Sequence, residues 1–594
     1  MTKKRDEIPE KERWNVALLY SSWGDWEADL ALWEKGANVQ KIGGYKGKLG
    51  DGPELVKELL DLTFSLDRHL SKLYTYAHLR HDEDVAEERA KQAFMRIGSL
   101  GNTFRQEISW VEPEILGLDE SYFRAEILSP YHIYLHKVIR SKPHLLSAEK
   151  EELCSLAAKG FETAYRAFGA FNNADLKFPL IEDGKGEMRE LTHGKYLLYL
   201  RDVDRVLRER AFKTLNRSFG AYENTVCELI NGQLQTHLFE KKARNYKSCL
   251  EAALFPHQID SEVYSSLIRA VRKKLPALHR YMALRKDLLG VSELHLYDMH
   301  VPLVSQVDLS MSYEKAERLV IDSLTPLGKE YQDDLEKGLL QERWVDRYEN
   351  ANKRSGAYSS GCYDSIPYIL MNYQGTFNDV KTLTHEAGHS MHSRLSNRNQ
   401  AYPYAQYPIF VAEVASTFHE QLLVGHLQKL LTKPEEKAYL INQEIEDIRS
   451  TFFRQTMFAE FELKIHEFVE QDIPLTPGLL KAEYRKLNQD YFGPDVVIDE
   501  EADWEWARIP HFYYNFYVYQ YATGLSAAHT LVKKVLEEGE SARHKYLQFL
   551  SSGNSRYPLE LLQLAGVDMK KGEAVELLID HFENLVTELK KVLR

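Results

Sequence analysis

The stretch between Pro434 and Pro474 contains neither glycine nor proline, and it is the part of the sequence that most restricts the fold. Its apolar residues recur every three or four positions, as in a helix that buries one face. This stripe consists of Ile441, Ile445, Ile448, Phe452, Ala459 and Leu463. Thr432 and Glu435 frame the early proline and fit a capping box. We therefore expect one helix of about 35 residues.

Helix breakers are scarce in the whole chain, with 32 glycines and 19 prolines in 594 residues, below the roughly 12% of average usage. This composition predicts a mainly α protein. From residue 14 to about residue 173 the pattern is helical, and Trp23, Trp26, Leu30 and Trp33 share one face, as expected of a core stripe. The run from His81 to Asp84 has the composition of a solvated helix face.

The pattern changes near residue 180, where residues 178–192 resemble a short hairpin around Asp183-Gly184. Helical periodicity resumes at about Lys195. We therefore predict two domains, a helical one over residues 1–200 and a second one over residues 201–594.

The formal net charge of −13, from 76 basic and 89 acidic side chains, provides no positive field for phosphate backbones, so nucleic acid is an unexpected partner. No segment has the 18 or more apolar residues of a membrane span, and the first residues lack a secretory apolar core. Four cysteines lie far apart, as in a protein with reduced thiols. We expect a cytoplasmic protein without a membrane partner. The sequence does not determine the oligomeric state.

The segment from His385 to His389 carries the clearest chemistry, because it has the pattern His-Glu-x-x-His. On a helix, His385 and His389 lie one turn apart and can reach one zinc ion at about 2.0 to 2.1 Å. Glu386 then lies beside the metal, where a general base can take a proton from a zinc-bound water. The alternative is a helix whose histidines only pack or face solvent.

A catalytic zinc needs a third protein ligand. His392 lies about 10.5 Å along the helix from His385, whereas ligand atoms around one zinc are about 3 to 3.5 Å apart, so it is excluded. Glu413 and Glu420 are seven residues apart on one face of an otherwise apolar segment. We assign Glu413 to the metal and Glu420 to the orientation of a ligand histidine. Exposure of both glutamates on the surface is the alternative.

With these residues identified, the sequence resembles the thimet oligopeptidase-like zinc metallopeptidases of the oligoendopeptidase F type. The resemblance extends from about residue 110 to the end, and residues 1–200 resemble the leading domain of that type. Four segments carry it: Tyr373 to His392, Phe410 to Glu420, Arg454 to Glu462, and His511 to Gly524. It implies that Glu413 is the third ligand of one zinc ion per chain. It also implies an elongated, zincin-like helical molecule with a deep channel that admits short unstructured peptides.

A cluster of aromatic residues follows His511, and Tyr514, Tyr517 and Tyr521 would share a face of a helix. Neutral hydroxyl and imidazole donors can stabilise the oxyanion of a tetrahedral intermediate. By resemblance, His511, Tyr514 and Tyr521 are assigned this role. An aromatic core stripe is the alternative for the tyrosines.

Just before the zinc helix, residues 367–373 form a predicted strand of a small sheet, whose edge can pair with an extended peptide. The combined prediction is a zinc-dependent endopeptidase acting on short peptides, with Glu386 as the general base. Two alternatives stay open: a helical peptide-binding or scaffold protein with a structural zinc site, and a zinc hydrolase that acts on a non-peptide amide.

Overall fold

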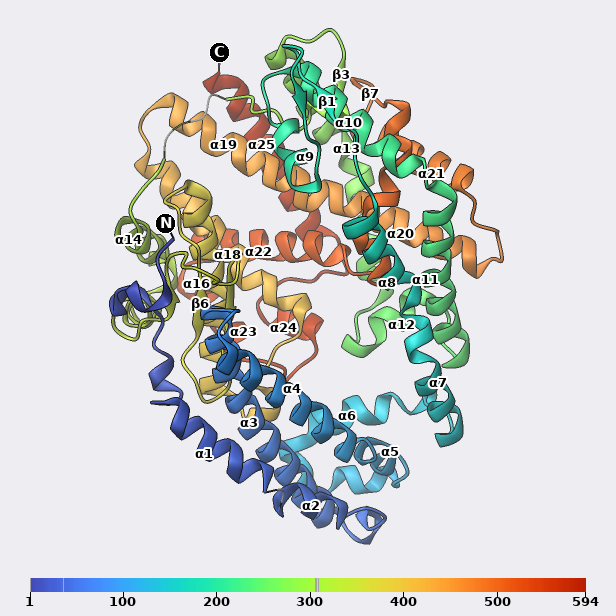
Figure 1. The fold of residues 1–594 in the computed structure, drawn as a ribbon, viewed down its shortest axis with the longest axis vertical. Coiled ribbons are helices and arrows are strands. Elements are labelled where there is room, and N and C mark those ends of the chain that lie inside the picture. The colour runs from blue at the N-terminus through green and yellow to red at the C-terminus, as the bar shows by residue number, and fades with distance from the viewer. Residues whose placement is uncertain (1, 36, 305–306, 308, 594) are drawn as a thin grey trace. The chain divides into compact units, whose positions relative to one another are not determined.

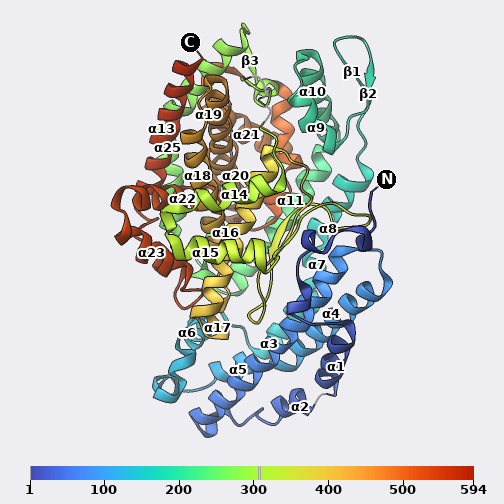
Figure 2. The same cartoon turned by 90° about the vertical axis from the view of Figure 1, so that its left-hand side faces the viewer.

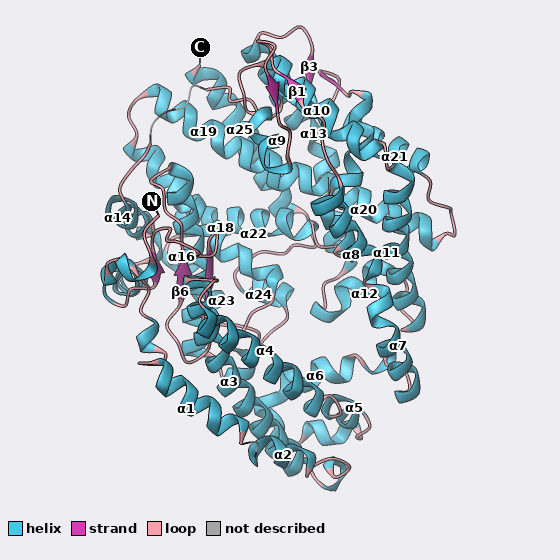
Figure 3. Ribbon diagram, viewed as in Figure 1, coloured by secondary structure: helices cyan, strands magenta, loops and turns pink. Residues whose placement is uncertain are grey.

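The computed structural model describes residues 2–35, 37–304, 307 and 309–593 and is mainly helical, as predicted (Figure 3). Contacts divide the chain into two compact units. The first unit comprises residues 1–142, 309–427 and 531–567, and the second comprises residues 143–308, 428–530 and 568–594. The predicted boundary at residue 200, the elongation and the channel stay predictions.

In the first unit, α3 and α4 lie side by side (Figures 1 and 2) and carry much of an apolar core. The helices of this unit are α1 (Trp23–Glu34), α2 (Ala37–Gly43), α3 (Pro53–Glu83), α4 (Glu88–Ile108), α5 (Val111–Leu116), α6 (His132–Arg140), α14 (Tyr313–Ser323), α15 (Lys329–Glu336), α16 (Phe377–Asn399), α17 (Tyr402–Ala405), α23 (Glu540–Leu550) and α24 (Pro558–Leu564). Trp26, Leu30 and Trp33 of α1 are buried and Trp23 packs partly buried against them, which confirms the predicted core stripe.

In the second unit, α25 packs against both α13 and α19. The helices of this unit are α7 (Ala148–Phe161), α8 (Thr163–Ala170), α9 (His193–Leu200), α10 (Arg205–Gly220), α11 (Glu223–Ala243), α12 (Cys249–Leu254), α13 (Ser261–Leu289), α19 (Pro434–Ile448), α20 (Arg454–Glu470), α21 (Pro477–Phe492) and α25 (Glu573–Val592). Two further helices, α18 (Ile409–Leu430) and α22 (Tyr519–Glu538), are divided between the units.

The predicted long helix is present from Pro434 to Glu470, as α19 and α20 joined by a π-helical turn at residues 449–453. The predicted capping box is wrong. The N-cap is Lys433, and no side chain caps it. The residue before a proline is held in an extended conformation, so the helix starts one residue later than a cap at Thr432 would require.

The strands are short. The predicted hairpin is confirmed by the antiparallel pair β1 (Ile181–Glu182) and β2 (Met188–Arg189). In the second unit β3 (Leu294–His295) pairs in parallel with β7 (Val496–Val497). In the first unit β4 (Val345–Asp346), β6 (Tyr368–Leu370) and β5 (Tyr358–Ser360) form a sheet in the order β4-β6-β5. This last sheet contacts α16, as predicted for the sheet beside the zinc helix.

One face of that sheet is covered by the chain's first residues. Trp14 packs with its ring 6.0 Å from Tyr368 and 6.4 Å from Tyr358, and it shares a small apolar cluster with Leu79 and Leu370. The other face turns toward α16, where Ser359 Oγ lies 2.8 Å from Ser390 Oγ. The sheet is thus held between the amino-terminal segment and the predicted zinc helix.

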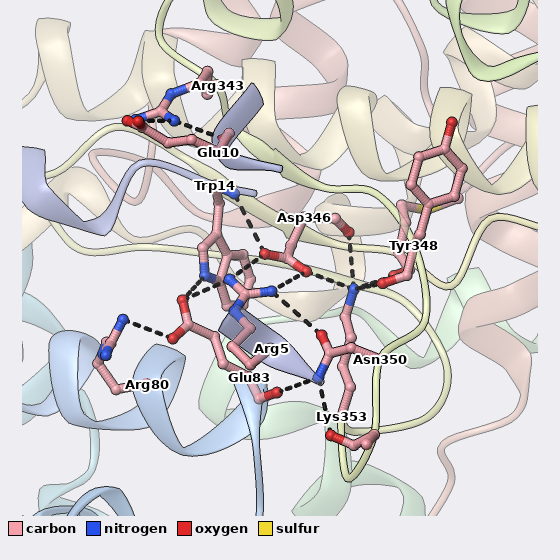
Figure 4. A network of polar contacts seen from close by, with 12 residues as sticks. Arg5, Glu10, Trp14, Arg80, Glu83, Arg343, Asp346, Tyr348, Asn350 and Lys353 are labelled. Carbon is pink, nitrogen blue, oxygen red and sulfur yellow. Dashed lines mark hydrogen bonds and ion pairs between the residues drawn. The ribbon is translucent and has the colours of Figure 1, made fainter. Parts of the chain in front are cut away.

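A buried network of charges joins the same segment to the sheet (Figure 4). Arg5 donates from one guanidinium nitrogen to Asp346 Oδ1 at 2.8 Å and from the other to Glu83 Oε1 at 2.8 Å. Lys353 pairs with Asp346 at 2.6 Å, and Trp14 Nε1 donates to Glu83 at 2.6 Å. The negative charges of Asp346 and Glu83 are therefore balanced by positive charges and hydrogen-bond donors, as buried charges require.

This network corrects the prediction that residues 81–84 form a solvated face, because Asp82 and Glu83 are buried. Burial raises the pKa of Asp82, but hydrogen bonds from His78 and His81 outweigh it, so that the pKa lies below its ordinary value. Asp82 also bonds Arg354 and Tyr358, and Glu83 bonds Arg5. These further partners come from distant parts of the chain, which local spacing does not reveal.

None of the described helices is long and apolar enough to cross a membrane. All four cysteines are free, as predicted. The cytoplasmic location stays a prediction.

Candidate active site

Helix α16 carries His385, Glu386 and His389. It begins after Thr376, whose hydroxyl accepts from the Asp379 backbone N–H, while the Asp379 carboxylate accepts from the Thr376 N–H at 2.9 Å. This reciprocal cap fixes the start of the helix. Two turns later, the histidine rings lie with their centroids 4.8 Å apart on one face.

Gly388 lets a second helix approach the zinc helix. A Cβ atom at this position would lie only 2.6 Å from the Ser416 Cα and 2.8 Å from the Ala415 carbonyl oxygen, both on α18. No side chain larger than hydrogen fits there without moving a backbone. This close approach brings Glu413, on α18, to the histidines of α16.

Three ligand atoms converge at one point. His385 Nε2 lies 3.2 Å from His389 Nε2, and the Glu413 Oε2 lies 3.3 Å from the first nitrogen and 3.5 Å from the second. The three residues form a group whose ligand atoms lie within 4.8 Å of one another. Separations of about 3 to 3.5 Å are those that bonds of roughly 2 Å to one tetrahedral zinc require. The donor set of two imidazoles and one carboxylate is that of a catalytic zinc site.

Glu420 lies behind the first ligand, where its Oε1 is 2.6 Å from His385 Nδ1. A carboxylate at this nitrogen fixes the ring and leaves Nε2 free to bind a metal. Burial lowers the pKa of His385, but hydrogen bonds to Glu413 and Glu420 raise it more, to about 10. The two carboxylates therefore create a negative potential that favours a cation at this point. Lys381, 3.8 Å from Glu420, was not predicted, although it lies one turn before His385.

Glu386 is buried beside the ligands. Burial raises the pKa of its carboxyl, while the charges of His385 and His389 and a hydrogen bond from the Ser359 backbone N–H act in the opposite direction. A carboxylate with a raised pKa is a better proton acceptor than an exposed glutamate. Nothing in the sequence pointed to Ser359, because its role comes from the position of β5.

The strand expected at the sheet edge is in fact central. Residues 367–373 contain β6, which lies between β4 and β5, so the prediction of an edge at β6 is wrong. Ile369 of β6 donates to the carbonyl of Trp344, just before β4, at 2.8 Å, and Met371, just after β6, donates to that of Asp346 in β4 at 2.9 Å. Tyr368 and Leu370 therefore bond to β5, and Ser359, opposite Ile369, points its backbone N–H and C=O away from β6. Within the described ranges, no strand pairs with this side of β5.

His392 lies apart from the three ligands. Its buried ring stacks on Tyr407 with the centroids 3.5 Å apart, and burial lowers its pKa to about 3. The position agrees with its exclusion as a ligand.

The predicted donors His511, Tyr514 and Tyr521 lie in the second unit, whereas the metal-ligand group lies in the first. The expected common helix face is wrong, because α22 begins only at Tyr519. A bend at Asn515 and Phe516, with φ of 53° and 60°, replaces the helix. The rings nevertheless lie close together, since the ring centroid of His511 is 5.4 Å from that of Tyr514 and 6.2 Å from that of Tyr521.

Tyr517 completes this cluster, with its ring 6.2 Å from Tyr514 and 5.5 Å from Tyr521. Burial lowers the pKa of His511. A hydrogen bond with Tyr165, followed by burial, raises the pKa of Tyr514. Both shifts keep these side chains neutral near pH 7, when a hydroxyl or a neutral imidazole can donate a hydrogen bond.

Comparisons with known proteins identify the family. The model of peptidase family M3 matches residues 198–580, and the model described as oligopeptidase F matches residues 117–178. Oligopeptidase PepF of Bacillus subtilis is 40% identical over 99% of this chain and 88% of its own length. An oligoendopeptidase F homolog of Lactococcus lactis is 36% identical over 100% of this chain and 99% of its own.

Solved structures show the same fold. The crystal structure of oligoendopeptidase-F from Enterococcus faecium superposes with a TM-score of 0.74 at 35% identity, covering 96% of this chain and 99% of that one. A crystal structure from Chlamydophila abortus gives a TM-score of 0.95 at 38% identity over the full length of both chains. The chain therefore belongs to peptidase family M3, as a metalloendopeptidase of the oligopeptidase F type.

Proposed function

We propose that the protein hydrolyses internal peptide bonds of short unstructured peptides, with one zinc ion held by His385, His389 and Glu413. The observation that carries this proposal is the convergence of the three ligand atoms, 3.2 to 3.5 Å apart, beside a buried glutamate. When bound, zinc supplies a Lewis acid that polarises the scissile carbonyl and lowers the pKa of a water.

Glu386 takes the proton of the attacking water and later delivers it to the leaving amine. The Ser359 N–H favours the charged form of this carboxyl group, and Glu420 holds the ring of His385. His511, Tyr514 and Tyr521 donate hydrogen bonds to the oxyanion that forms on the former carbonyl. The neutral state of His511 and Tyr514 and the gathering of all three rings into one cluster support this role.

The unpaired side of β5 receives the peptide backbone. The Ser359 carbonyl, which faces away from β6, accepts a hydrogen bond from a peptide N–H in the manner of strand addition. Such main-chain pairing binds peptides of many sequences. The names of the curated relatives, oligopeptidase and oligoendopeptidase, support peptides as the substrate class.

The test is cleavage of a quenched fluorescent peptide of about eight residues, with chelator and with zinc restored, beside Glu386→Gln protein whose zinc is quantified. We expect internal cleavage that the chelator removes and zinc restores, and no turnover in the variant although it retains about one zinc per chain. Normal turnover by Glu386→Gln would overturn its role. Absence of cleavage by a zinc-loaded wild-type protein would favour a peptide-binding scaffold.

A further inference from the structure

A cavity of about 330 Å³ lies in the first unit, at the carboxyl end of β5. Its size is at the lower end for ligand pockets, about 300 Å³ and above, and suits a single side chain. It is formed by the end of β5 with the loop to Pro367, by the last turns of α16, and by α17 with the residues after it. Its polar lining includes Ser360, Tyr363, Ser393, Asn397, Gln406 and Tyr407.

The cavity is linked directly to the turn of α16 that carries a ligand. Tyr407 places its hydroxyl 2.9 Å from Ser393 Oγ and donates to the His389 carbonyl oxygen at 3.3 Å. At the other wall, Ser359 belongs both to the lining and to the hydrogen bond with Glu386. A peptide that pairs with β5 and has its scissile bond at Glu386 therefore extends toward the end of the strand at which this cavity lies.

None of the described residues that line the cavity carries a charge. Asn397 donates to the Cys362 carbonyl oxygen at 3.2 Å. Its Oδ1, like the Ser360 hydroxyl and the Gln406 amide, has no hydrogen-bond partner in the part of the chain that the structure describes. These groups can satisfy a neutral hydrogen-bonding side chain, whereas a charged side chain would lose its hydration without a counter-charge.

The direction of β5 decides which part of a peptide reaches the cavity. β5 runs from Tyr358 to Ser360, and the cavity begins at its carboxyl end. Antiparallel pairs outnumber parallel ones roughly two- to threefold, and β5 is already antiparallel to β6. In an antiparallel peptide, the residue at the cavity lies on the amino-terminal side of the residue opposite Ser359.

We propose that this cavity is a substrate subsite that takes a neutral, hydrogen-bonding side chain from the amino-terminal side of the scissile bond. The inference rests on the proposed function, since it concerns the same peptides. It makes Asn397 a specificity-determining residue, because its amide lies in the wall of the cavity. Exchange of this amide for a carboxylate of the same shape tests that role.

The test compares Asn397→Asp with Asn399→Asp, a matched control that adds the same charge to the last turn of α16 outside the cavity lining. Peptides varied at each position near the scissile bond give kcat/KM values. For wild-type protein, kcat/KM should be about tenfold higher for peptides with Gln or Tyr at the subsite position than for peptides with Lys or Glu there. Asn397→Asp should raise the Lys-to-Gln ratio by about tenfold or more, and Asn399→Asp should not change it.

An unchanged ratio at every position in Asn397→Asp overturns the subsite, and a change confined to the carboxyl-terminal side overturns the antiparallel direction. Gln406→Glu serves as a second variant if Asn397→Asp does not fold. Binding of the same intact peptides to Glu386→Gln protein, with and without Asn397→Asp, tests the subsite without turnover. If the wild-type protein does not cleave these peptides but the binding assay still shows the expected peptide preference, the result would count against the proposed function and not against the subsite.

Discussion

The backbone N–H of Phe516 donates a hydrogen bond of 2.6 Å to Oε1 of Glu462, a carboxyl group that is fully buried in α20. Phe516 has a positive φ, which is unfavourable for a bulky residue, and its ring packs 4.2 Å from His466. The bend that turns Tyr514 and Tyr517 toward His511 is thus anchored by one acceptor in the core.

Glu462→Leu should loosen this bend. The variant removes the acceptor and leaves a buried N–H without a partner, which costs about 1 to 3 kcal/mol. Glu462→Gln keeps a carbonyl oxygen for the N–H and is the matched control. Hydrogen exchange of residues 509–518 should accelerate in the Leu variant and stay near wild type in the Gln variant. Equal protection in all three proteins would show that the bend does not depend on Glu462.

The same carboxyl group predicts a pH dependence of stability. Burial raises the pKa of Glu462 to about 8, from an ordinary value of 4.5. The folded state therefore binds this proton more tightly than the unfolded state. The stabilisation of the folded state by the protonated carboxyl group is complete below pH 4.5 and is lost as the pH rises toward 8. The free energy of unfolding, relative to that of Glu462→Gln, should fall by about 1.4 kcal/mol per pH unit at most in this window. Parallel pH profiles for the two proteins in denaturant titrations would contradict the raised pKa.

Gly388→Ala should weaken zinc binding. Its Cβ would lie 2.6 Å from the Ser416 Cα, so α16 and α18 must separate and carry Glu413 away from the histidines. We expect destabilisation of about 1 to 3 kcal/mol and a zinc content below that of wild type. Gly425→Ala is the control, because a Cβ at this position on α18 meets nothing within 4 Å. It should keep its zinc and gain about 0.5 to 1 kcal/mol. Full zinc occupancy in Gly388→Ala would refute the packing argument.

Glu420→Ala should lower zinc affinity about 10- to 100-fold, because the ring of His385 loses the carboxylate that orients it. Glu444→Ala offers a matched comparison, since it breaks a histidine–carboxylate pair of the same 2.6 Å length, with His581, in the other unit. Zinc affinity can be measured by competition with a chromophoric chelator. Similar affinities for the two variants would mean that Glu420 does not support the metal.

Several features followed from the sequence because they depend on residues close together in the chain. The four-residue spacing of His385 and His389 places both on one helix face, and the seven-residue spacing of Glu413 and Glu420 does the same on α18. The apolar stripe of the Pro434–Glu470 helix likewise needs only helical periodicity. These expectations agree with the structure.

Other features came only from the tertiary structure, since their partners are far apart in the sequence. Asp82 and Glu83 are buried because Arg5 and Arg354 reach them, and periodicity alone had made them a solvated face. The order of β4, β6 and β5 depends on pairing between segments, so β5 was not recognised as the free edge.

The bend at Phe516 shows the physical reason for this division. The spacing of Tyr514, Tyr517 and Tyr521 suggested a helix through residues 514–521, a stretch without glycine or proline. The buried acceptor of Glu462, 54 residues earlier, stabilises a conformation that a phenylalanine alone would avoid. The sequence by itself determined the helices and the spacing of the proposed zinc ligands through short-range periodicity, whereas burial and long-range hydrogen bonds decided the sheet edge, the buried charges and the tyrosine cluster.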